Sequence, residues 1–323
     1  MTQPSSNRAS HDLRVVVLAG GLSHERDVSV RSGRRVADAL RSTGVDVGVH
    51  DVDAGLVPAL QEIGPDVVWP LLHGATGEDG SVREILELLR LPYVGTGPRS
   101  SRVAWNKEIA KGVVAAAGIA TPDSVTLQQD LFRELGAGAV MDAIVERLGL
   151  PLVVKPSRGG SALGVSIVDR PGDLARALVA SYAYGDTALV ERAIVGTEVA
   201  VSIVEREDGP AALPAVEIVT EGPYDYDARY NPGRSQYFAP ARLDADVTER
   251  VAAAALTAFR ALGLRHLGRV DLIVDADGVP HFLETNVAPG MTETSLFPQA
   301  VLAAGTSIAK VYRDIVERAA RTQ

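Results

Sequence analysis

The side chains best suited to chemistry lie in residues 268–286, and they are Arg269, Asp271, Glu284 and Asn286. This stretch predicts two strands joined by a tight turn at Asp275–Gly278, because Asp and Gly favour turns. Side chains alternate along a strand, so the four polar residues share one face of the hairpin. Two carboxylates and an amide oxygen beside an arginine match a hard-cation site that holds Mg²⁺ against substrate phosphates.

The pairing of the two strands decides whether this site forms. With a loop of two or four residues, Arg269 faces Glu284 and Asp271 faces Phe282. The opposite face is then suited to a core, and it consists of Val270, Leu272, Val274 and Leu283 together with His281. A slip of one residue would destroy the site, since it moves a whole strand's side chains to the other face. The alternative interpretation is a hairpin whose polar face is only solvated.

A glycine-rich segment follows a second apolar strand, and it begins with Lys155 and ends with Gly164. Glycines let backbone N–H groups approach an anion, and the lysine adds a positive charge, so the segment indicates a phosphate-binding loop. It lacks the spacing of a P-loop, and an ordinary hairpin connection is the alternative. Ser161 lies in this loop without a histidine pattern to activate it, which indicates a hydrogen-bonding residue rather than a nucleophile.

Three further polar positions follow predicted strands. Glu25 comes after a Gly-Gly turn, and His73 lies in a glycine-rich loop. The segment Glu191–Glu198 follows an apolar strand and could bind an adenine edge and ribose hydroxyls. Each has a structural alternative, because lone histidines and carboxylates after strands are common in proteins without such a site.

The first hundred residues alternate strands and helices, which predicts a doubly wound parallel sheet with ligands beyond the carboxyl ends of its strands. The expected strands are 14–19, 45–49 and 66–72, with a helix at 28–43. Mixed α+β structure follows, with helices at 106–117, about 131–148 and 247–262, and strands at 152–155, 164–168, 187–192, 199–204 and 215–219. Residues 221–240 form a long loop with four of the eight tyrosines, which favours a lid.

These elements predict a tail and three domains. Residues 1–12 are a flexible tail, 13–104 an N-terminal doubly wound α/β domain, 105–194 a central domain, and 195–323 a C-terminal domain that carries the lid loop 221–240.

Composition excludes several classes of function. The chain has 323 residues, a formal charge of −9 and no cysteine. Its acidity argues against a general nucleic-acid binder, and the lack of cysteine excludes disulfides and zinc–thiolate sites. No apolar run reaches membrane-spanning length, and the polar start lacks the apolar core of a signal peptide, so no membrane partner is expected and the cytoplasm is the expected location.

Together these segments resemble the D-alanine–D-alanine ligase family of the ATP-grasp superfamily, from about Arg14 to Arg318. The matching segments, in the family's order, are Gly20–Ser29, His73–Gly80, Lys155–Gly164, Tyr224–Tyr230, Gly268–Asp271 and Glu284–Thr292. The resemblance implies an α/β and α+β protein with the ATP-grasp fold, three domains and a homodimeric assembly. It also implies ATP and two Mg²⁺ (or Mn²⁺) ions as cofactors.

The resemblance assigns roles residue by residue. It implies a cofactor-binding set of Lys107, Lys155, Ser157, Gly160, Ser161, Glu191, Ala193, Ile194, Glu198, Arg229 and Asn286. In that set the lysines bind phosphates, residues 191, 193 and 194 line the adenine site, and residue 198 meets the ribose. The implied metal ligands are Asp271, Glu284 and Asn286.

The implied substrate contacts lie on other segments. Glu25 would anchor the ammonium of the first D-alanine, with Ser161 and Tyr230 as hydrogen-bonded partners and His73 nearby. The remaining implied residues are Arg269 and the Gly290 N–H at the developing oxyanion, and Ser295 with Leu296 at the carboxylate of the second D-alanine. The implied reaction is the ATP-dependent ligation of two D-alanines to D-alanyl-D-alanine for peptidoglycan synthesis. It passes through an acyl phosphate and needs positioning and charge neutralisation, which these residue types supply.

The chain departs from the family pattern at several positions. Arg229 stands where a lysine is usual, Trp105 where a methionine is usual, and Ala162 where a serine is frequent. One alternative is a related ligase whose second substrate is D-lactate or another D-amino acid, although Tyr230 favours the dipeptide. A second is a non-catalytic binding module, against which the retained charged residues argue. A simple dehydrogenase is excluded because its glycine fingerprint is absent from the first hundred residues.

Overall fold

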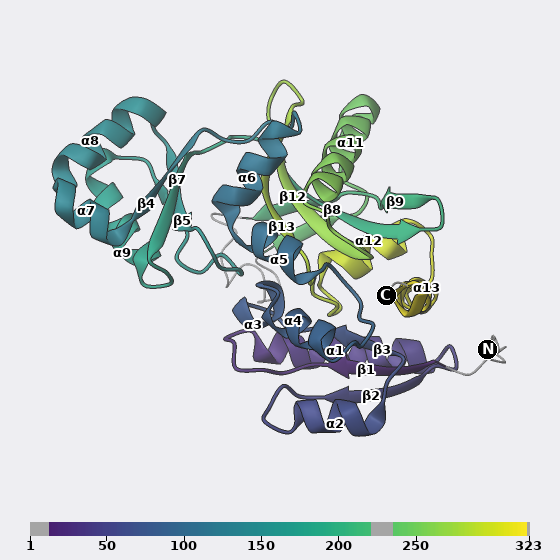
Figure 1. The fold of residues 1–323 in the computed structure, drawn as a ribbon. Helices are drawn as coiled ribbons and strands as arrows, with labels where there is room; N and C mark the ends of the chain where they lie inside the picture. The colour runs from purple at the N-terminus through teal and green to yellow at the C-terminus, as the bar shows by residue number, and fades with distance from the viewer. Residues whose placement is uncertain (1–12, 221–234, 322–323) are drawn as a thin grey trace, which may run out of the picture.

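The computed structural model describes residues 13–220 and 235–321, and these residues form three sheets with helices packed on them (Figure 1). The N-terminal sheet lies below the two others in this view, and the remaining sheets lie side by side above it. No helix among the described residues is long and apolar enough to cross a membrane.

The N-terminal sheet is parallel, in the order β2-β1-β3, with β1 at Arg14–Leu18, β2 at Asp46–His50 and β3 at Val67–Pro70. Its helices are α1 (Arg26–Arg41), α2 (Leu56–Ile63), α3 (Ala75–Glu78) and α4 (Ser81–Leu88). Val15 and Val17 share a core with α1, whereas Val16 and Leu18 share one with α2 and α4. Helices therefore cover both faces, which confirms the predicted doubly wound sheet.

A helix from far along the chain completes one face of this sheet. Helix α13 (Ile308–Arg321) packs on α1, and its Tyr312 meets Trp69 of β3 edge to face, with ring centroids 5.3 Å apart. Tyr312, Ile315 and Val316 belong to the same core as Val15 and Val17.

The smaller antiparallel sheet has the order β4-β7-β5-β6, with β4 at Ser124–Gln128, β5 at Leu152–Pro156, β6 at Ser166–Val168 and β7 at Thr187–Arg192. Its covering helices are α7 (Gln129–Leu135), α8 (Ala137–Leu148) and α9 (Leu174–Tyr182), after a 3₁₀ turn at Pro171–Asp173. The single helix predicted at 131–148 is wrong, because Gly136, at φ 85°, ends α7 and starts α8.

The larger sheet has the order β11-β10-β8-β12-β13, and β9 pairs with β8. Its strands are β8 (Thr197–Arg206), β9 (Gly209–Ala212), β10 (Val216–Thr220), β11 (Ser235–Phe238), β12 (Leu267–Val274) and β13 (Pro280–Asn286). Helices α5 (Pro98–Trp105), α6 (Lys107–Ala116) and α11 (Ala245–Ala261) share the core on one face, and α12 (Leu296–Ala303) packs on the other.

The predicted pairing of the β12–β13 hairpin is wrong. Arg269 pairs with Asn286 and Asp271 with Glu284, and a bulge follows between Asp271 and Leu272. The loop closes through the Asp275 N–H, which donates to the Val279 carbonyl at 3.1 Å, so five residues separate the strands.

The bulge returns the polar residues of β13 to the same face as those of β12, which a loop with an odd number of residues would otherwise separate. A five-residue loop alone places Glu284 opposite Val270, on the core side, whereas one extra residue in β13 returns it to the side of Asp271. The predicted core face is also corrected. Phe282 is buried beside Leu272 and Val274, whereas Leu283 is only half-buried. His281 bonds instead to Asp275 at 2.8 Å.

Candidate active site

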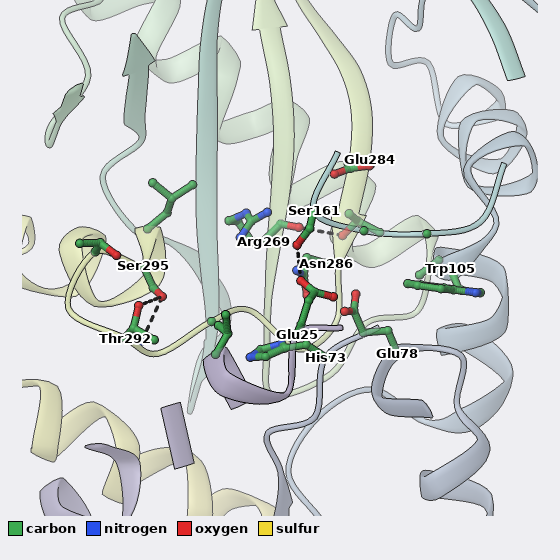
Figure 2. A pocket seen from close by; sticks show the side chains of 18 of the residues that line it. Glu25, His73, Glu78, Trp105, Ser161, Arg269, Glu284, Asn286, Thr292 and Ser295 are labelled. Atoms are coloured by element: carbon green, nitrogen blue, oxygen red, sulfur yellow. Dashed lines mark hydrogen bonds between the residues drawn. The ribbon is translucent and has the colours of Figure 1, made fainter. Parts of the chain in front are cut away.

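Two adjoining cavities lie where the three sheets meet. The central cavity holds eleven of the residues expected from the sequence: Glu25, His73, Lys107, Gly160, Ser161, Arg269, Glu284, Asn286, Gly290, Ser295 and Leu296 (Figure 2). The inter-sheet cavity lies between the small and the large sheet, and its expected residues are Lys107, Lys155, Gly160, Glu198, Asp271 and Glu284. Four residues, Lys107, Gly159, Gly160 and Glu284, border both cavities, so the two spaces are neighbours.

Glu25 and Ser161 meet although 136 residues separate them in sequence. Glu25 is buried at the residue before α1, and the Ser161 hydroxyl donates to its Oε1. Ser161 has φ 52°, in the left-handed region, so its backbone strain is held by this loop conformation. The geometry places a carboxylate and a hydroxyl together at the wall of the central cavity, where an ammonium group would find acceptors.

His73 and Glu78 lie beside Glu25 in the same cavity (Figure 2). Burial lowers the pKa of His73, whose Nε2 has no hydrogen-bond partner within the described part of the chain. Burial, followed by the nearby Glu25 carboxylate, raises the pKa of Glu78 to about 8. Sequence reasoning missed Glu78, although it lies in the same glycine-rich segment as His73.

The β12–β13 hairpin supplies the charged floor of both cavities. Arg269 holds Asp271 through two hydrogen bonds, Nε to Oδ1 at 2.7 Å and Nη2 to Oδ2 at 2.8 Å, and both residues are buried. Lys107 Nζ lies 3.3 Å from Glu284 Oε2. Within the described ranges no cluster of three His, Asp or Glu side chains forms a metal site, and the candidate set has two carboxylates and one amide, that of Asn286.

The glycine-rich loop docks on the start of α6. Lys107 Nζ donates to the Gly159 carbonyl at 2.5 Å, and the Lys107 N–H donates to the Ser157 carbonyl at 2.9 Å. The Ser157 hydroxyl turns to Asn106 Oδ1 at 3.2 Å and is fully buried, so it lies behind the loop and outside the lining of either cavity.

The residues expected around adenine differ in burial and in their contacts. Glu191 is 2% exposed and bridges two lysines, with Lys155 at 2.5 Å and Lys111 at 2.6 Å. Ala193 and Ile194 follow β7 as half-buried residues, and neither borders the central or the inter-sheet cavity. Sequence reasoning missed Lys111, although its position one helical turn after Lys107 is a usable signal.

Ser295 closes the far end of the central cavity. It precedes α12, and its Oγ accepts from the Thr292 N–H at 3.0 Å and lies 2.8 Å from Thr292 Oγ1 (Figure 2). A Cβ at Gly290 would lie 2.8 Å from Ser295 Oγ, so a larger residue there would displace this hydroxyl. Leu296 is buried in the core beneath. Arg229, Tyr230 and most of the predicted lid loop 221–240 lie outside the described residues.

Comparison with known proteins decides the family. The protein-family model described as D-ala D-ala ligase C-terminus matches residues 113–317 of this chain. The family model described as D-ala D-ala ligase N-terminus matches residues 53–96. The chain belongs to the D-alanine–D-alanine ligase family.

Relatives of the ligase family match almost the whole chain. The D-alanine–D-alanine ligase of Desulforudis audaxviator is 43% identical over 312 residues, which cover 95% of this chain and 97% of that protein. The solved D-alanine–D-alanine ligase of Bacillus anthracis in complex with ATP aligns with a TM-score of 0.81 and 30% identity, covering 96% of this chain and 98% of that one. The VanG D-Ala:D-Ser ligase of Enterococcus faecalis aligns with a TM-score of 0.83 and 28% identity, covering 96% and 100%. The expected family and ATP-grasp fold are confirmed.

Proposed function

We propose that this chain joins two D-alanines into D-alanyl-D-alanine with the conversion of ATP to ADP and phosphate, as a step of peptidoglycan synthesis. The observation that carries the proposal is the meeting of Glu25 and Ser161 in a cavity that also contains Arg269 and Glu284. Groups that can bind an amine and groups that can neutralise negative charge therefore lie together in this cavity. The neighbouring inter-sheet cavity has two lysines. Family membership supports the same reaction.

ATP occupies the inter-sheet cavity in this proposal. Lys107 and Lys155 bind its phosphates, and the glycine-rich loop that includes Gly160 and Ser161 donates backbone N–H groups. Glu198, which borders this cavity, takes the ribose hydroxyls, and the adenine ring extends beyond the cavity to the backbone at Ala193 and Ile194.

Glu191 has a different place in this proposal from the one expected from sequence alone. Its carboxylate oxygens already lie against two ammonium groups, so Glu191 contributes to the nucleotide site chiefly as their counter-ion. Arg229 of the lid adds a further cation toward the phosphates, and Ser157 supports the loop from behind.

The oxygens of Asp271, Glu284 and Asn286 fit Mg²⁺ (or Mn²⁺), and we propose two such ions. The two carboxylates lie directly opposite each other across the β12–β13 pair, and each lies against a neighbouring cation, Arg269 or Lys107. Oxygen donors of this kind suit hard cations. When bound, the ions supply charge neutralisation at the triphosphate.

The first D-alanine lies in the central cavity with its ammonium on Glu25, where Ser161 and Tyr230 complete the anchor and His73 lies nearby. Its carboxylate attacks the γ-phosphate of ATP, which gives an acyl phosphate and ADP. No protein nucleophile is needed, because the substrates supply both nucleophiles, a carboxylate oxygen in this step and an amine nitrogen in the next. The lid loop excludes water from the acyl phosphate, which would otherwise hydrolyse.

The second D-alanine binds at the other end of the cavity, with its carboxylate at Ser295 and beside Leu296. Its amine attacks the acyl carbon, and phosphate leaves from the tetrahedral intermediate. Arg269 and the Gly290 N–H stabilise the negative oxygen of that intermediate.

The experiment that tests the function is phosphate release by the purified protein with ATP and Mg²⁺. D-Alanine should stimulate release and L-alanine should not, and mass spectrometry should detect the dipeptide. Absence of release with any amino acid would favour the non-catalytic binding module. Release only with D-alanine plus D-serine or D-lactate would identify a ligase with a different second substrate, an alternative favoured by the VanG alignment.

We further propose that the enzyme is a homodimer and acts in the cytoplasm, where ATP is available. It needs no nucleic-acid or membrane partner, in line with its acidic charge of −9. Sedimentation equilibrium would reveal the mass of the assembly, and a monomer at all concentrations would refute the dimer.

A further inference from the structure

Lys111 is a buried cation for which the proposed reaction has no use so far. It lies on α6, is 4% exposed, and its Nζ donates to Glu191 Oε2 at 2.6 Å and to the Pro122 carbonyl at 2.9 Å. The other Glu191 oxygen, Oε1, lies 2.5 Å from Lys155 Nζ. One buried carboxylate is therefore shared by two ammonium groups.

The fold places these three groups together. Glu191 on β7 pairs with Val153 on β5, so Lys155, two residues further along β5, points to the same face of the small sheet. Lys111 reaches this face from α6, one helical turn after Lys107. Thus one helix presents two lysines, of which Lys107 holds the glycine-rich loop and Lys111 holds Glu191.

The single negative charge of Glu191 does not balance the positive charges of Lys111 and Lys155. Although burial raises it, the pKa of Glu191 is lowered because Lys155 and Lys111 stabilise its ionised form. Burial lowers the pKa of Lys111 from its usual value, whereas Glu191, and to a smaller extent Asp123, favour its charged form. With both lysines protonated, the two ammonium groups and the Glu191 carboxylate together carry one net positive charge. Lys155 borders the inter-sheet cavity and Lys111 does not, so the surplus charge faces that cavity through Lys155.

We propose that Lys111 is a positioning residue for ATP, which neutralises Glu191 so that Lys155 keeps its charge for the nucleotide phosphates. Without Lys111, Glu191 and Lys155 form a neutral pair, and the positive charge that this group directs at the cavity is lost. This inference rests on the proposed function, in which Lys155 binds phosphates.

The first test compares Lys111→Met with Lys111→Arg by steady-state kinetics. Lys111→Met should raise the KM for ATP about tenfold or more, the size expected when one hydrogen bond to a charged group of the nucleotide is lost. The KM for D-alanine should stay within about twofold, and Lys111→Arg should restore the KM for ATP to within about threefold. The matched control is Lys310→Met, the same change at an exposed lysine, which should alter neither constant.

The second test asks whether Lys111 acts through Glu191. If it does, the double variant Lys111→Met/Glu191→Gln binds ATP no more weakly than Glu191→Gln alone, because the carboxylate that Lys111 neutralises is gone. Multiplied losses in the double variant would overturn the proposal. If Lys111→Met does not accumulate as folded protein, Lys111→Gln, which is uncharged but keeps a donor, must show the same rise in KM.

Two further outcomes separate this inference from the function on which it rests. An unchanged KM for ATP in Lys111→Met with a lowered Tm would show a structural role only and overturn the inference. A wild-type protein without D-alanine-dependent phosphate release would instead refute the proposed function. Calorimetry with a non-hydrolysable ATP analogue then decides about Lys111 by itself: weaker binding to Lys111→Met supports the inference, and equal binding overturns it.

Discussion

Arg269 and Asp271 lie two residues apart on one face of β12 and are joined by two parallel hydrogen bonds of 2.7 and 2.8 Å. A pair of parallel hydrogen bonds of this kind fixes both the position of the positive charge and the orientation of the guanidinium plane. The arginine proposed to stabilise the oxyanion is therefore oriented by a carboxylate that is proposed to bind metal. The two proposed roles on this hairpin are coupled through this one contact.

Arg269→Lys should lower kcat about 10²-fold or more, although the positive charge is kept. A lysine makes a single-point contact with Asp271 and cannot hold a planar fork at the oxyanion. Rates of phosphate release under saturating substrates measure the effect, and a thermal melt verifies that the variant is folded. A kcat within tenfold of wild type would remove Arg269 from the oxyanion site.

Glu284→Gln should abolish turnover and leave the fold intact, because it removes the charge of a proposed metal ligand that lies beside Lys107. Mn²⁺ binding, followed by electron paramagnetic resonance, should weaken in parallel. The control is Glu293→Gln, the same change at an exposed carboxylate that pairs with Arg35. Activity of Glu284→Gln within tenfold of wild type would show that the metal assignment is wrong.

Tyr230→Phe should raise the use of D-lactate relative to D-alanine as second substrate. The tyrosine lies outside the described residues, so this prediction comes from the family resemblance, which links its loss with depsipeptide formation. Competition between the two substrates, with products separated by mass spectrometry, gives the ratio. An unchanged ratio would reject Tyr230 as the residue that favours the dipeptide.

His266 should make stability depend on pH below neutrality. It is buried, and its Nδ1 accepts the Gly95 N–H at 3.0 Å, so the ring is neutral. Burial, then the charge of Arg265, lowers its pKa to about 3. The unfolded state, with a pKa of about 6.5, therefore binds the proton first as pH falls. Its contribution to stability is fully present above about pH 6.5 and is lost as pH falls toward 3.

The wild type should accordingly lose about 2 kcal/mol of unfolding free energy between pH 7 and pH 5 from this group. His266→Asn tolerates the left-handed backbone there, at φ 64°, but removes the titration. Denaturant melts at both pH values should show a less stable variant at pH 7 with a smaller change to pH 5. Parallel losses in the two proteins would contradict the assignment.

Much of the site could be predicted from the sequence because its residues stand at the ends of recognisable strands. Glu25 follows β1 and a Gly-Gly turn, and Lys155 lies near the end of β5, so the elements that position both were predictable from local pattern. That Glu25 meets Ser161 was implied by the family resemblance, since the strand pattern itself does not say which loops come together.

The register of the hairpin could not be predicted in the same way. Alternation of side chains fixes which residues share a strand face, but the parity of a loop decides how two strands align. The odd loop at 275–279 and the bulge at Leu283 compensate each other, so the polar face was predicted correctly from a pairing that was wrong.

The buried charged residues could not be predicted from the sequence either. Lys111 lies in the helix predicted at 106–117 and Glu78 in the glycine-rich loop 73–80, and neither was singled out, because the local sequence does not show that a distant strand or loop will bury them. Their burial depends on tertiary packing and their charge state on partners such as Glu191 and Glu25.

The docking of α13 on the N-terminal sheet affects the order in which the protein can be completed during synthesis. Strands β1 to β3 leave the ribosome long before Tyr312, Ile315 and Val316, which share their core. Chains grow at about 5–20 residues per second, so the part of this face that α1 leaves uncovered waits on the order of ten seconds or more for α13. During that interval the nascent chain exposes apolar surface of the kind that promotes aggregation, and the earliest sheet to be made is among the last to be completed.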